Sequence, residues 1–529
     1  MQKHLTTNDL LNGPLRYFLY FLLLIPAFFF RDFSPPNELK YFSIVDEALR
    51  NNTWFTFYNH GEIYADKPPL FFWLMMLAKI ITGKHIMWII GLFSLIPAIG
   101  IIIVMDKWFK KFSINHNPLV SNILLLTTTM FASVALFIRM DMLMTFFIVL
   151  AFYTFFKIYK NEHLQAEKWL LPIYIFLAIF SKGAMGFLIP TISITIFLII
   201  SKQIKTFGKY LGFKQWAILV VLCVIWFSMV YAEGGNDYLQ NILFKQTVGR
   251  GVNAFHHKAP FWFYFPRMLW AFAPWTLLCI TLIIKGIYKK MFNSDIHRFF
   301  AVIIISTIVM LSIVSSKLDI YLLPIYPFVI YLCSTILYTE NQNKSIKIVL
   351  YIQSALFALF LPTFLVAKKY IPYDFSGILP YIGITILSGA GVLSIWLIIR
   401  NKTIHSIICL AFGLLFLICI SSFIIPQFNK YIGFREMAEA AENKAKSENI
   451  DRYAYYKFYT AQNIDVYLHT KLECINSVEQ LDSLNRLQNK TILFVRAREL
   501  RRDNDFREWI QTKEPEWKVG DYSWYIVGN

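Results

Sequence analysis

The chain has 529 residues, of which 57% are hydrophobic, 18% aromatic and only 16% charged, and its formal net charge is +18. Soluble domains contain about 25% charged residues, so this composition excludes a single soluble globule, a disordered chain and a collagen-like chain. Lys and Arg are scattered between apolar runs and form no single patch, which favours membrane orientation over nucleic-acid binding. Five of the six cysteines lie in apolar runs, so the sequence offers no disulfide framework and no CxxC metal pair.

Membrane-spanning helices are the first predicted elements. A helix that crosses about 30 Å of hydrocarbon needs about 20 mostly apolar residues, and about thirteen runs of the chain approach that length. They lie near 14–30, 86–106, 119–138, 142–157, 169–181, 184–201, 215–232, 264–285, 299–315, 318–338, 346–367, 376–399 and 403–426. A shorter apolar segment at 68–83 is interpreted as a helix that lies along the interface or dips into it. The sequence therefore predicts a mainly α, polytopic membrane protein.

Basic loops set the expected orientation of these spans. The loops at 107–118, 202–214 and 285–298 fall on one side if the first run spans, and the positive-inside rule makes that side cytoplasmic. The first run lacks a small-residue cleavage site, so we expect a retained helix and not a signal peptide. The N-terminus is then cytoplasmic, and the polar tail lies outside.

The polar tail is expected to form its own domain. The segments FREMAEAAENKAK and SVEQLDSLNRLQ have the pattern of amphipathic helices, and TILFVRA and SWYIV have that of strands. The sequence thus predicts a membrane domain over 1–428, with a first outer loop at 31–85, and a soluble α/β domain over 429–529.

Charged residues at the outer ends of the spans are the candidate functional groups, because placing a charge inside a membrane is costly and such residues are usually kept for function. On the expected topology they share the outer side, and we expect them to line one cationic, carboxylate-containing cavity. They are Glu38, Lys40, Lys67, Arg139, Asp141, Lys182, His256, His257, Lys258, Lys317 and Asp319.

The first outer loop carries the most informative pattern. In ELKYFSIVDEALR, at 38–50, apolar residues recur at helical spacing, which predicts an interfacial amphipathic helix. Pro68 and Pro69 then fix an extended entry into the next helix and leave Asp66 and Lys67 just outside it. A lysine at this place is suited to hold a lipid phosphate. The alternative is an interface anchor whose stem lies along apolar surface.

The ordered motifs NELKY, YADKPPLFFWL, RMDMLMTFF, SKGAMGFLIP, HHKAPFWFY, FAPW and SSKLDIYLLPIYP resemble the aminoarabinose-transferase/protein-mannosyltransferase group of GT-C membrane glycosyltransferases. The resemblance runs from about residue 14 to 330 and includes a trailing periplasmic domain. It implies an enzyme of the bacterial inner membrane that takes a sugar from a polyprenyl (undecaprenyl) phosphate at the outer face. The expected acceptor is a lipid, such as lipid A or lipopolysaccharide, or a protein.

The resemblance also assigns the contacts to the donor. It places Lys67 and Lys40 on the carrier phosphate, and Tyr64 and Tyr321 as hydrogen-bond donors. The family usually has arginine where this chain has Lys40, and a lysine loses the bidentate fork of a guanidinium. Two further cations, Lys182 and Lys317, either contribute to this site or simply anchor their turns.

The catalytic base is the point at which the chain departs from the family. The family's first outer loop typically begins Asp-Glu, whereas this chain has Asn37-Glu38, and a neutral amide accepts no proton at pH 7. We expect Glu38, with Asp141, to supply the carboxylate. The alternatives are that Asp141 only caps its helix, that Glu38 only stabilises a helix dipole, or that Asn37 marks an inactive enzyme.

A metal is not expected to be required. The resemblance places Asp66 and His256 where a divalent cation binds in the family, but two ligands do not define a site, and an ordinary loop histidine is the alternative. We expect a monomer that binds a polyprenyl-phosphate sugar, an acceptor and membrane lipids, and no nucleic acid. Two other functions remain as alternatives, a flippase or transporter of polyprenyl-linked glycans and a polysaccharide ligase.

Overall fold

A computed structural model describes residues 13–249, 258–370, 377–486 and 489–528. The chain divides into two compact units. The first, called here the helical unit, comprises Met1–Phe28, Ala65–Leu74 and Trp88–Ser422. The second, called the loop–tail unit, comprises Phe29–Tyr64, Met75–Met87 and Phe423–Asn529.

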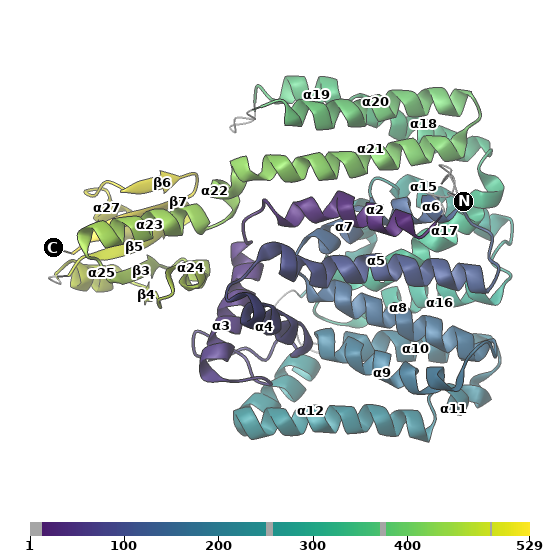
Figure 1. Cartoon of the computed structure of the whole chain (residues 1–529), viewed down its shortest axis with the longest axis horizontal. Coiled ribbons are helices and arrows are strands. Elements are labelled where there is room, and N and C mark those ends of the chain that lie inside the picture. Colours follow the sequence, from purple (N-terminus) through teal and green to yellow (C-terminus); the bar gives the residue numbers. More distant parts are fainter. Residues whose placement is uncertain (1–12, 250–257, 371–376, 487–488, 529) are drawn as a thin grey trace, which may run out of the picture. The chain divides into compact units, whose positions relative to one another are not determined.

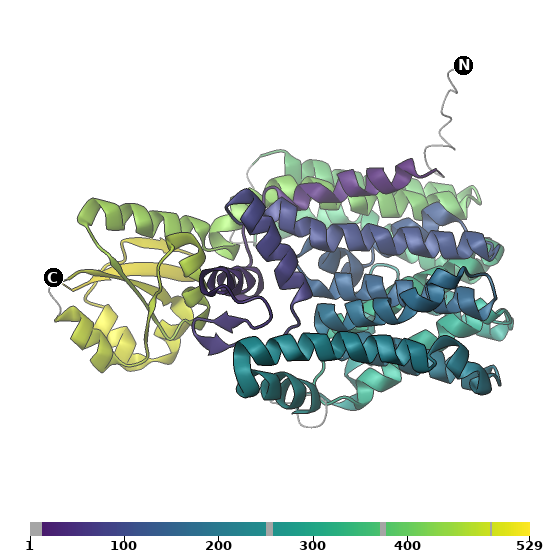
Figure 2. The ribbon, with the colours of Figure 1, turned by 60° about the horizontal axis from the view of Figure 1, so that its bottom comes forward.

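The helical unit consists of helices, and its long helices run side by side (Figures 1 and 2). The long and short α-helices of this unit are α2 (Leu15–Leu24), α5 (Met87–Lys111), α6 (Pro118–Leu126), α7 (Thr129–Leu136), α8 (Met140–Tyr159), α9 (Gln165–Lys182), α10 (Met185–Ile200), α11 (Phe207–Tyr210), α12 (Phe213–Gln240), α14 (Tyr264–Ala271), α15 (Thr276–Tyr288), α16 (Asp295–Ile313), α17 (Tyr326–Glu340), α18 (Lys344–Ala358), α19 (Phe360–Ala367), α20 (Leu379–Ile399) and α21 (Thr403–Ile424). A further helix, α4 (Leu70–Thr82), begins in this unit and ends in the other.

The expected polytopic, mainly helical architecture is confirmed, but the number of helices suited to span is lower than thirteen. Among the described residues, eight helices are long and apolar enough to cross a membrane, or up to ten if each of two bent helix pairs is one span. The other predicted runs fall in α2, which is short, in α10, with 16 residues, and in α9, whose 18 residues include three charged side chains. Length and charge therefore account for the difference.

The hairpin of α9 and α10 shows how the motif SKGAMG fixes a charged side chain at a helix end. Gly183 has a φ of 91°, a left-handed conformation that ends α9 directly after Lys182. At Gly186, an added Cβ would lie 2.2 Å from the carbonyl carbon of Ala178, so only glycine permits this close approach of α10 to α9. The two glycines thus hold Lys182 at a defined place beside the turn.

In the loop–tail unit, the first outer loop forms the predicted amphipathic helix. A π-helical turn, Pro35–Leu39, leads into α3 (Lys40–Asn51), which buries Phe42, Ile44 and Val45. A short antiparallel hairpin of β1 (Tyr58–Asn59) and β2 (Glu62–Ile63) follows.

The tail forms a five-stranded mixed sheet in the order β4-β3-β5-β7-β6, which confirms a small sheet domain at the C-terminal end. Strands β3, β4 and β5 are parallel, and β7 pairs antiparallel with β5 and β6. The elements are α22 (Asn429–Ile432), α23 (Arg435–Glu448), β3 (Arg452–Tyr456), α24 (Asp465–Leu468), β4 (Glu473–Ile475), α25 (Val478–Asn485), β5 (Thr491–Arg496), α26 (Ala497–Arg502), α27 (Asn504–Ile510), β6 (Trp517–Val519) and β7 (Tyr522–Val527).

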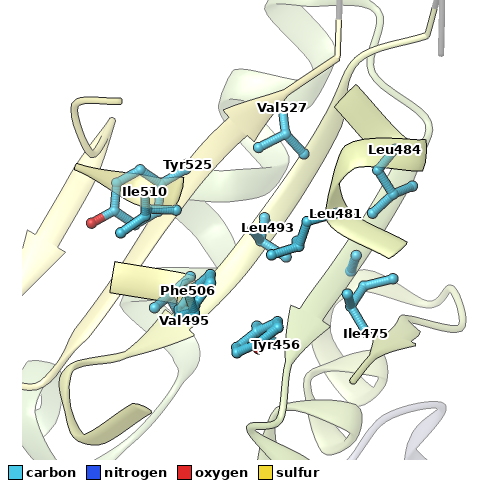
Figure 3. Packing of buried hydrophobic residues seen from close by; sticks show 11 residues of the cluster. Tyr456, Ile475, Leu481, Leu484, Leu493, Val495, Phe506, Ile510, Tyr525 and Val527 are labelled. Atoms are coloured by element: carbon cyan, nitrogen blue, oxygen red, sulfur yellow. The ribbon is translucent and has the colours of Figure 1, made fainter. Parts of the chain in front are cut away.

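A hydrophobic core joins one face of this sheet to α25 and α27. Figure 3 shows Leu481 and Leu484 of α25 beside Leu493 of β5, and Phe506 of α27 beside Tyr456 of β3. The rings of Tyr456 and Phe506 stack with centroids 3.8 Å apart. The predicted helix at SVEQLDSLNRLQ and both predicted strands are present, and this core buries apolar residues of each. The other predicted helix is present as α23, which buries Met437, Ala438, Ala441 and Ala445.

Buried polar contacts tie the first outer loop to the tail within this unit. The Asp32 carboxylate accepts hydrogen bonds from the Tyr467 hydroxyl at 2.6 Å and from the Arg435 backbone N–H at 3.0 Å. On α24, the Asp465 carboxylate accepts a hydrogen bond from the Ser43 hydroxyl at 2.9 Å. Burial, reinforced by the charge of Asp46, raises the pKa of Asp465 to about 7.

Candidate functional site

A cavity of about 300 Å³ lies among the helices of the helical unit. Four parts of the chain line it: residues 65–68, the turn between α9 and α10, the end of α12 with the segment after it, and the segment after α16. Most of its lining is apolar, and its charged side chains are Asp66, Lys67 and Lys182. Two cations thus face a mostly apolar space beside one carboxylate.

Lys67 and Asp66 reach this cavity because of the proline pair that follows them. Pro68 and Pro69 are buried and directly precede α4, so they leave the two charged residues just outside the N-terminal end of that helix. Both side chains are half-buried and line the cavity. The sequence-based placement of Lys67 beside a helix entry is therefore what the structure has.

Lys182 forms a buried ion pair with Asp141. Lys182 is the last residue of α9 and Asp141 lies in the first turn of α8, so each charge also suits the dipole of its own helix. Asp141 is only 2% exposed, and the residue at the N-cap of α8 is Arg139, not Asp141. Lys67 and Arg139 are both close enough to Lys182 to repel its charge. Asp141 therefore sits in a group of three cations.

Tyr321 and Lys317 take different positions in the same part of the helical unit. The Tyr321 ring lines the cavity, and the Lys182 ammonium lies over it at 4.9 Å from the centroid. Lys317 is 4% exposed and donates to the backbone oxygens of Ala259 at 3.0 Å and Val314 at 2.5 Å. Lys317 therefore anchors its turn, which was one of the two roles expected for it.

The candidate residues between 37 and 64 of the first outer loop belong to the loop–tail unit. Both oxygens of Glu38 accept hydrogen bonds from the Arg31 guanidinium, at 2.6 and 2.7 Å, and Oε2 also accepts from the Ser34 N–H at 2.8 Å. Glu38 is 1% exposed. The Lys40 ammonium lies over the Tyr64 ring at 4.5 Å from its centroid, which brings together two predicted phosphate contacts.

The candidate residues thus form two groups. Asp66, Lys67, Asp141, Lys182, Lys317 and Tyr321 lie in the helical unit, and Asn37, Glu38, Lys40 and Tyr64 lie in the loop–tail unit. His256 and His257 lie outside the described residues. Within the described ranges, no group of three or more His, Cys, Asp or Glu side chains is arranged to hold a metal ion. The convergence of both groups on one site stays a prediction.

Sequence reasoning missed residues of two kinds. The first is Arg31, which directly follows the first apolar run; an arginine at such a place needs a carboxylate nearby when it is buried, and that need was the available signal. Trp226 and Gln246 line the cavity from α12 and the segment after it. A tryptophan within an apolar run has no local pattern that separates a cavity wall from a lipid-facing position.

Several known proteins are similar to this chain in sequence. Residues 66–230 match the family model described as dolichyl-phosphate-mannose-protein mannosyltransferase. An undecaprenyl phosphate-alpha-4-amino-4-deoxy-L-arabinose arabinosyl transferase of Wigglesworthia glossinidia brevipalpis is 27% identical over 347 residues, 63% of this chain and 60% of that protein. The corresponding protein of Shewanella sediminis is 23% identical over 65% of this chain and 63% of its own length.

A solved structure extends the similarity to nearly the whole chain. The crystal structure of ArnT from Cupriavidus metallidurans bound to undecaprenyl phosphate has a TM-score of 0.78 to this chain, with 14% identity and 98% of each chain covered. At this identity the match shows a shared fold. The chain spans a little over 60% of the length of the curated relatives it matches in sequence.

Proposed function

We propose that this chain is a glycosyltransferase. Its resemblance to the GT-C group of aminoarabinose transferases and protein mannosyltransferases is confirmed in sequence and in fold. It moves a sugar from a polyprenyl phosphate carrier to an acceptor at the outer face of a bacterial inner membrane. The named relatives use undecaprenyl phosphate-linked aminoarabinose, and the solved structure binds undecaprenyl phosphate. The carrier, the side of the membrane and the remaining spans are part of this proposal.

The observation that carries the proposal is the mostly apolar cavity that holds Lys67 and Lys182. When a sugar leaves a phosphate carrier, negative charge grows on the phosphate oxygens. Fixed cations aimed at that charge stabilise the transition state, and they do so more strongly where little water screens them. Apolar walls beside the cations also suit an isoprenoid tail.

The Asp141–Lys182 pair has a role in this scheme that follows from its burial. A lone buried ammonium is strongly unfavourable, so Asp141 keeps Lys182 charged while the cavity is empty. When a carrier phosphate enters, Lys182 gains a second anion and its hold on Asp141 weakens. We assign to Asp141, once it is less tightly held, the role of taking the proton of the acceptor hydroxyl.

We assign Glu38 a different role, that of ordering the first outer loop. Both its oxygens accept from Arg31, and one also accepts from Ser34, so three of its roughly four acceptor sites are engaged by its own loop. Such charge-assisted bonds hold the Glu38 side chain against Arg31 and Ser34 and fix the start of the loop. Asn37 accepts no proton, so it has no part in the transfer of the proton.

The acceptor we propose is a lipid such as lipid A, with a protein hydroxyl as the second choice. Support for a lipid is the similarity to aminoarabinose transferases over more than half of the chain, whereas the mannosyltransferase model matches residues 66–230. Mass spectrometry of envelope lipids and glycoproteins from cells with and without the gene identifies the acceptor. Loss of a sugar from a lipid species supports the first choice, and loss from a protein overturns it.

The donor chemistry is tested on the full chain in detergent with radiolabelled polyprenyl-phosphate sugars. Release of the polyprenyl phosphate is followed in the presence of envelope lipids. Lys67→Ala is expected to reduce the rate at least about 100-fold, which is typical when one group that stabilises transition-state charge is removed.

Lys84→Ala is the matched control, because Lys84 belongs to the same outer loop, is exposed and does not line the cavity. Its rate should stay within about twofold of that of the wild type. Equal rates for Lys67→Ala and the wild type, with both proteins folded, would contradict the proposed role of the cavity.

A further inference from the structure

The tail sheet contains a topological switch point that the proposed transfer does not use. The chain leaves β3 for β4 on one side, and it then crosses back to β5 on the other side of β3. All three strands are parallel, so their carboxyl ends lie at the same edge of the sheet. In open parallel sheets the crevice outside these ends, where the connections diverge, is the usual place for a ligand.

A cavity of about 590 Å³ lies at this edge. It is lined by residues 457–460 after β3, by Asn476 after β4, and by residues at the end of β5 and in α26. Its volume falls within the range of small-molecule sites, which is about 300–1,000 Å³. The cavity lies wholly within the tail, since every lining residue falls between 457 and 502.

The charges around this cavity are strongly unbalanced. Four basic side chains line it, Lys457, Arg496, Arg498 and Arg502, and one acidic side chain, Glu499. Such an excess of cations in a concave site attracts and concentrates anions.

These four basic side chains differ in the ion pairs and ring contacts that they already make within the tail. The Lys457 ammonium is paired with Asp503 at 2.6 Å. The Arg496 guanidinium lies 5.9 Å from the centroids of the Phe458 and Tyr522 rings, and its buried Nε has no hydrogen-bond partner among the described residues.

Arg498 and Arg502 are exposed, and neither forms an ion pair within the part of the chain that the structure describes. Their neighbour Arg501 differs, because its guanidinium lies 3.7 Å from the Asp521 carboxylate. The guanidinium groups of Arg498 and Arg502 therefore remain to bind an anion in the cavity.

The remaining lining identifies the class of ligand. Guanidinium groups match the oxygens of a phosphate by forked hydrogen bonds, and they do so better than ammonium groups. Beside them, the Tyr459 ring is 61% exposed, and its hydroxyl lies 3.2 Å from Oδ1 of Asn476. An exposed aromatic face next to amide and hydroxyl groups suits a sugar ring. We propose that the switch-point cavity binds a phosphorylated sugar, with the phosphate on Arg498 and Arg502 and the sugar beside Tyr459.

The test uses the full chain in detergent and titrates glucose 1-phosphate, inorganic phosphate and glucose by isothermal titration calorimetry. Glucose 1-phosphate is expected to bind more tightly than either of the other two. Arg502→Ala should weaken its binding about tenfold, in line with the loss of a hydrogen bond between charged groups. Arg501→Ala removes the same charge from the neighbouring position of α26 and should change the affinity less than about twofold.

Two further arms separate this site from other sources of binding. Lys67→Ala removes a cation from the cavity of the helical unit, and the binding that depends on Arg502 should persist in it, whether or not the proposed transfer occurs. A phosphorylated disaccharide lipid in mixed micelles is the last titrant. Tighter binding of that lipid than of glucose 1-phosphate supports a glycolipid as the natural ligand, and the reverse order supports a soluble sugar phosphate.

Three results would overturn the proposal. The first is no saturable binding of glucose 1-phosphate to the wild type. The second is equal affinity for glucose 1-phosphate and inorganic phosphate, which removes the sugar from the assignment. The third is an equal loss of glucose 1-phosphate affinity in Arg501→Ala and Arg502→Ala. The loss would then come from the change in net charge and not from a contact made by Arg502.

Discussion

The Arg31–Glu38 pair yields the prediction that best separates a structural carboxylate from a catalytic one. Glu38→Gln leaves the Arg31 guanidinium buried without a compensating charge. Removing one partner of a buried ion pair costs about 3–5 kcal/mol. Each kcal/mol lowers the melting temperature by about 2–4 °C in units of 150–250 residues. The variant is therefore expected to melt roughly 6–20 °C below the wild type.

A second substitution restores the balance of charge. In Arg31→Met/Glu38→Gln no buried charge is left unpaired, and the amide oxygen of the introduced glutamine still accepts from the Ser34 N–H, so most of the lost stability should return. Since we assign Glu38 to the ordering of the loop, sugar transfer should return with the stability.

Thermal unfolding followed by tryptophan fluorescence, and donor turnover measured on the same preparations, check both expectations. A Glu38→Gln variant as stable as the wild type would refute the argument from burial. A double variant that is stable yet inactive would show that Glu38 itself takes the proton.

Three further predictions follow from other contacts. Burial raises the pKa of Asp465 to about 7, so between about pH 4 and pH 7 the folded state holds a proton that the unfolded state has lost. The stability of the fold should therefore fall as pH rises through this range, and Asp465→Asn should flatten the dependence in melting curves. Asp141→Asn should lower kcat at least about 100-fold, whereas Lys182→Met should also raise KM for the donor, as steady-state kinetics would show. Gly186→Val should destabilise the chain by about 1–3 kcal/mol through its clash with the backbone of α9, whereas Gly389→Ala, where an added Cβ meets nothing within 4 Å, should not destabilise it in the same denaturation assay.

The parts of the fold that the sequence predicts are those with a strong local period. Segment 435–448 is helical because its small and apolar residues repeat at the helical interval, and 491–496 is a strand because it is a short continuous apolar run that the sheet buries. The position of Lys67 was predictable for a similar reason, since a proline pair fixes the backbone on its C-terminal side. Such signals depend on neighbours in the sequence alone.

The pairings that hold the candidate residues were not predictable in this way. Glu38 meets Arg31 across a π-helical turn that begins at Pro35, and no regular period links the two positions. Asp141 has the local pattern of a helix cap, and only the packing of α8 on α9 brings it to Lys182. Among the described residues, eight to ten helices are long and apolar enough to span, fewer than the thirteen apolar runs, because apolar content alone does not show where a helix ends.

The Asp32 carboxylate has a consequence for exchanging parts between related enzymes. Two of its hydrogen-bond donors, Arg435 and Tyr467, are contributed by a segment some four hundred positions downstream. An added Cβ at Gly433 would lie 1.9 Å from one of its oxygens. A hybrid protein that takes its C-terminal portion from another species would leave the Asp32 carboxylate without these two donors unless residues 29–64 are exchanged with it. These two segments can therefore be exchanged between homologues only together, and they should be inherited as a pair.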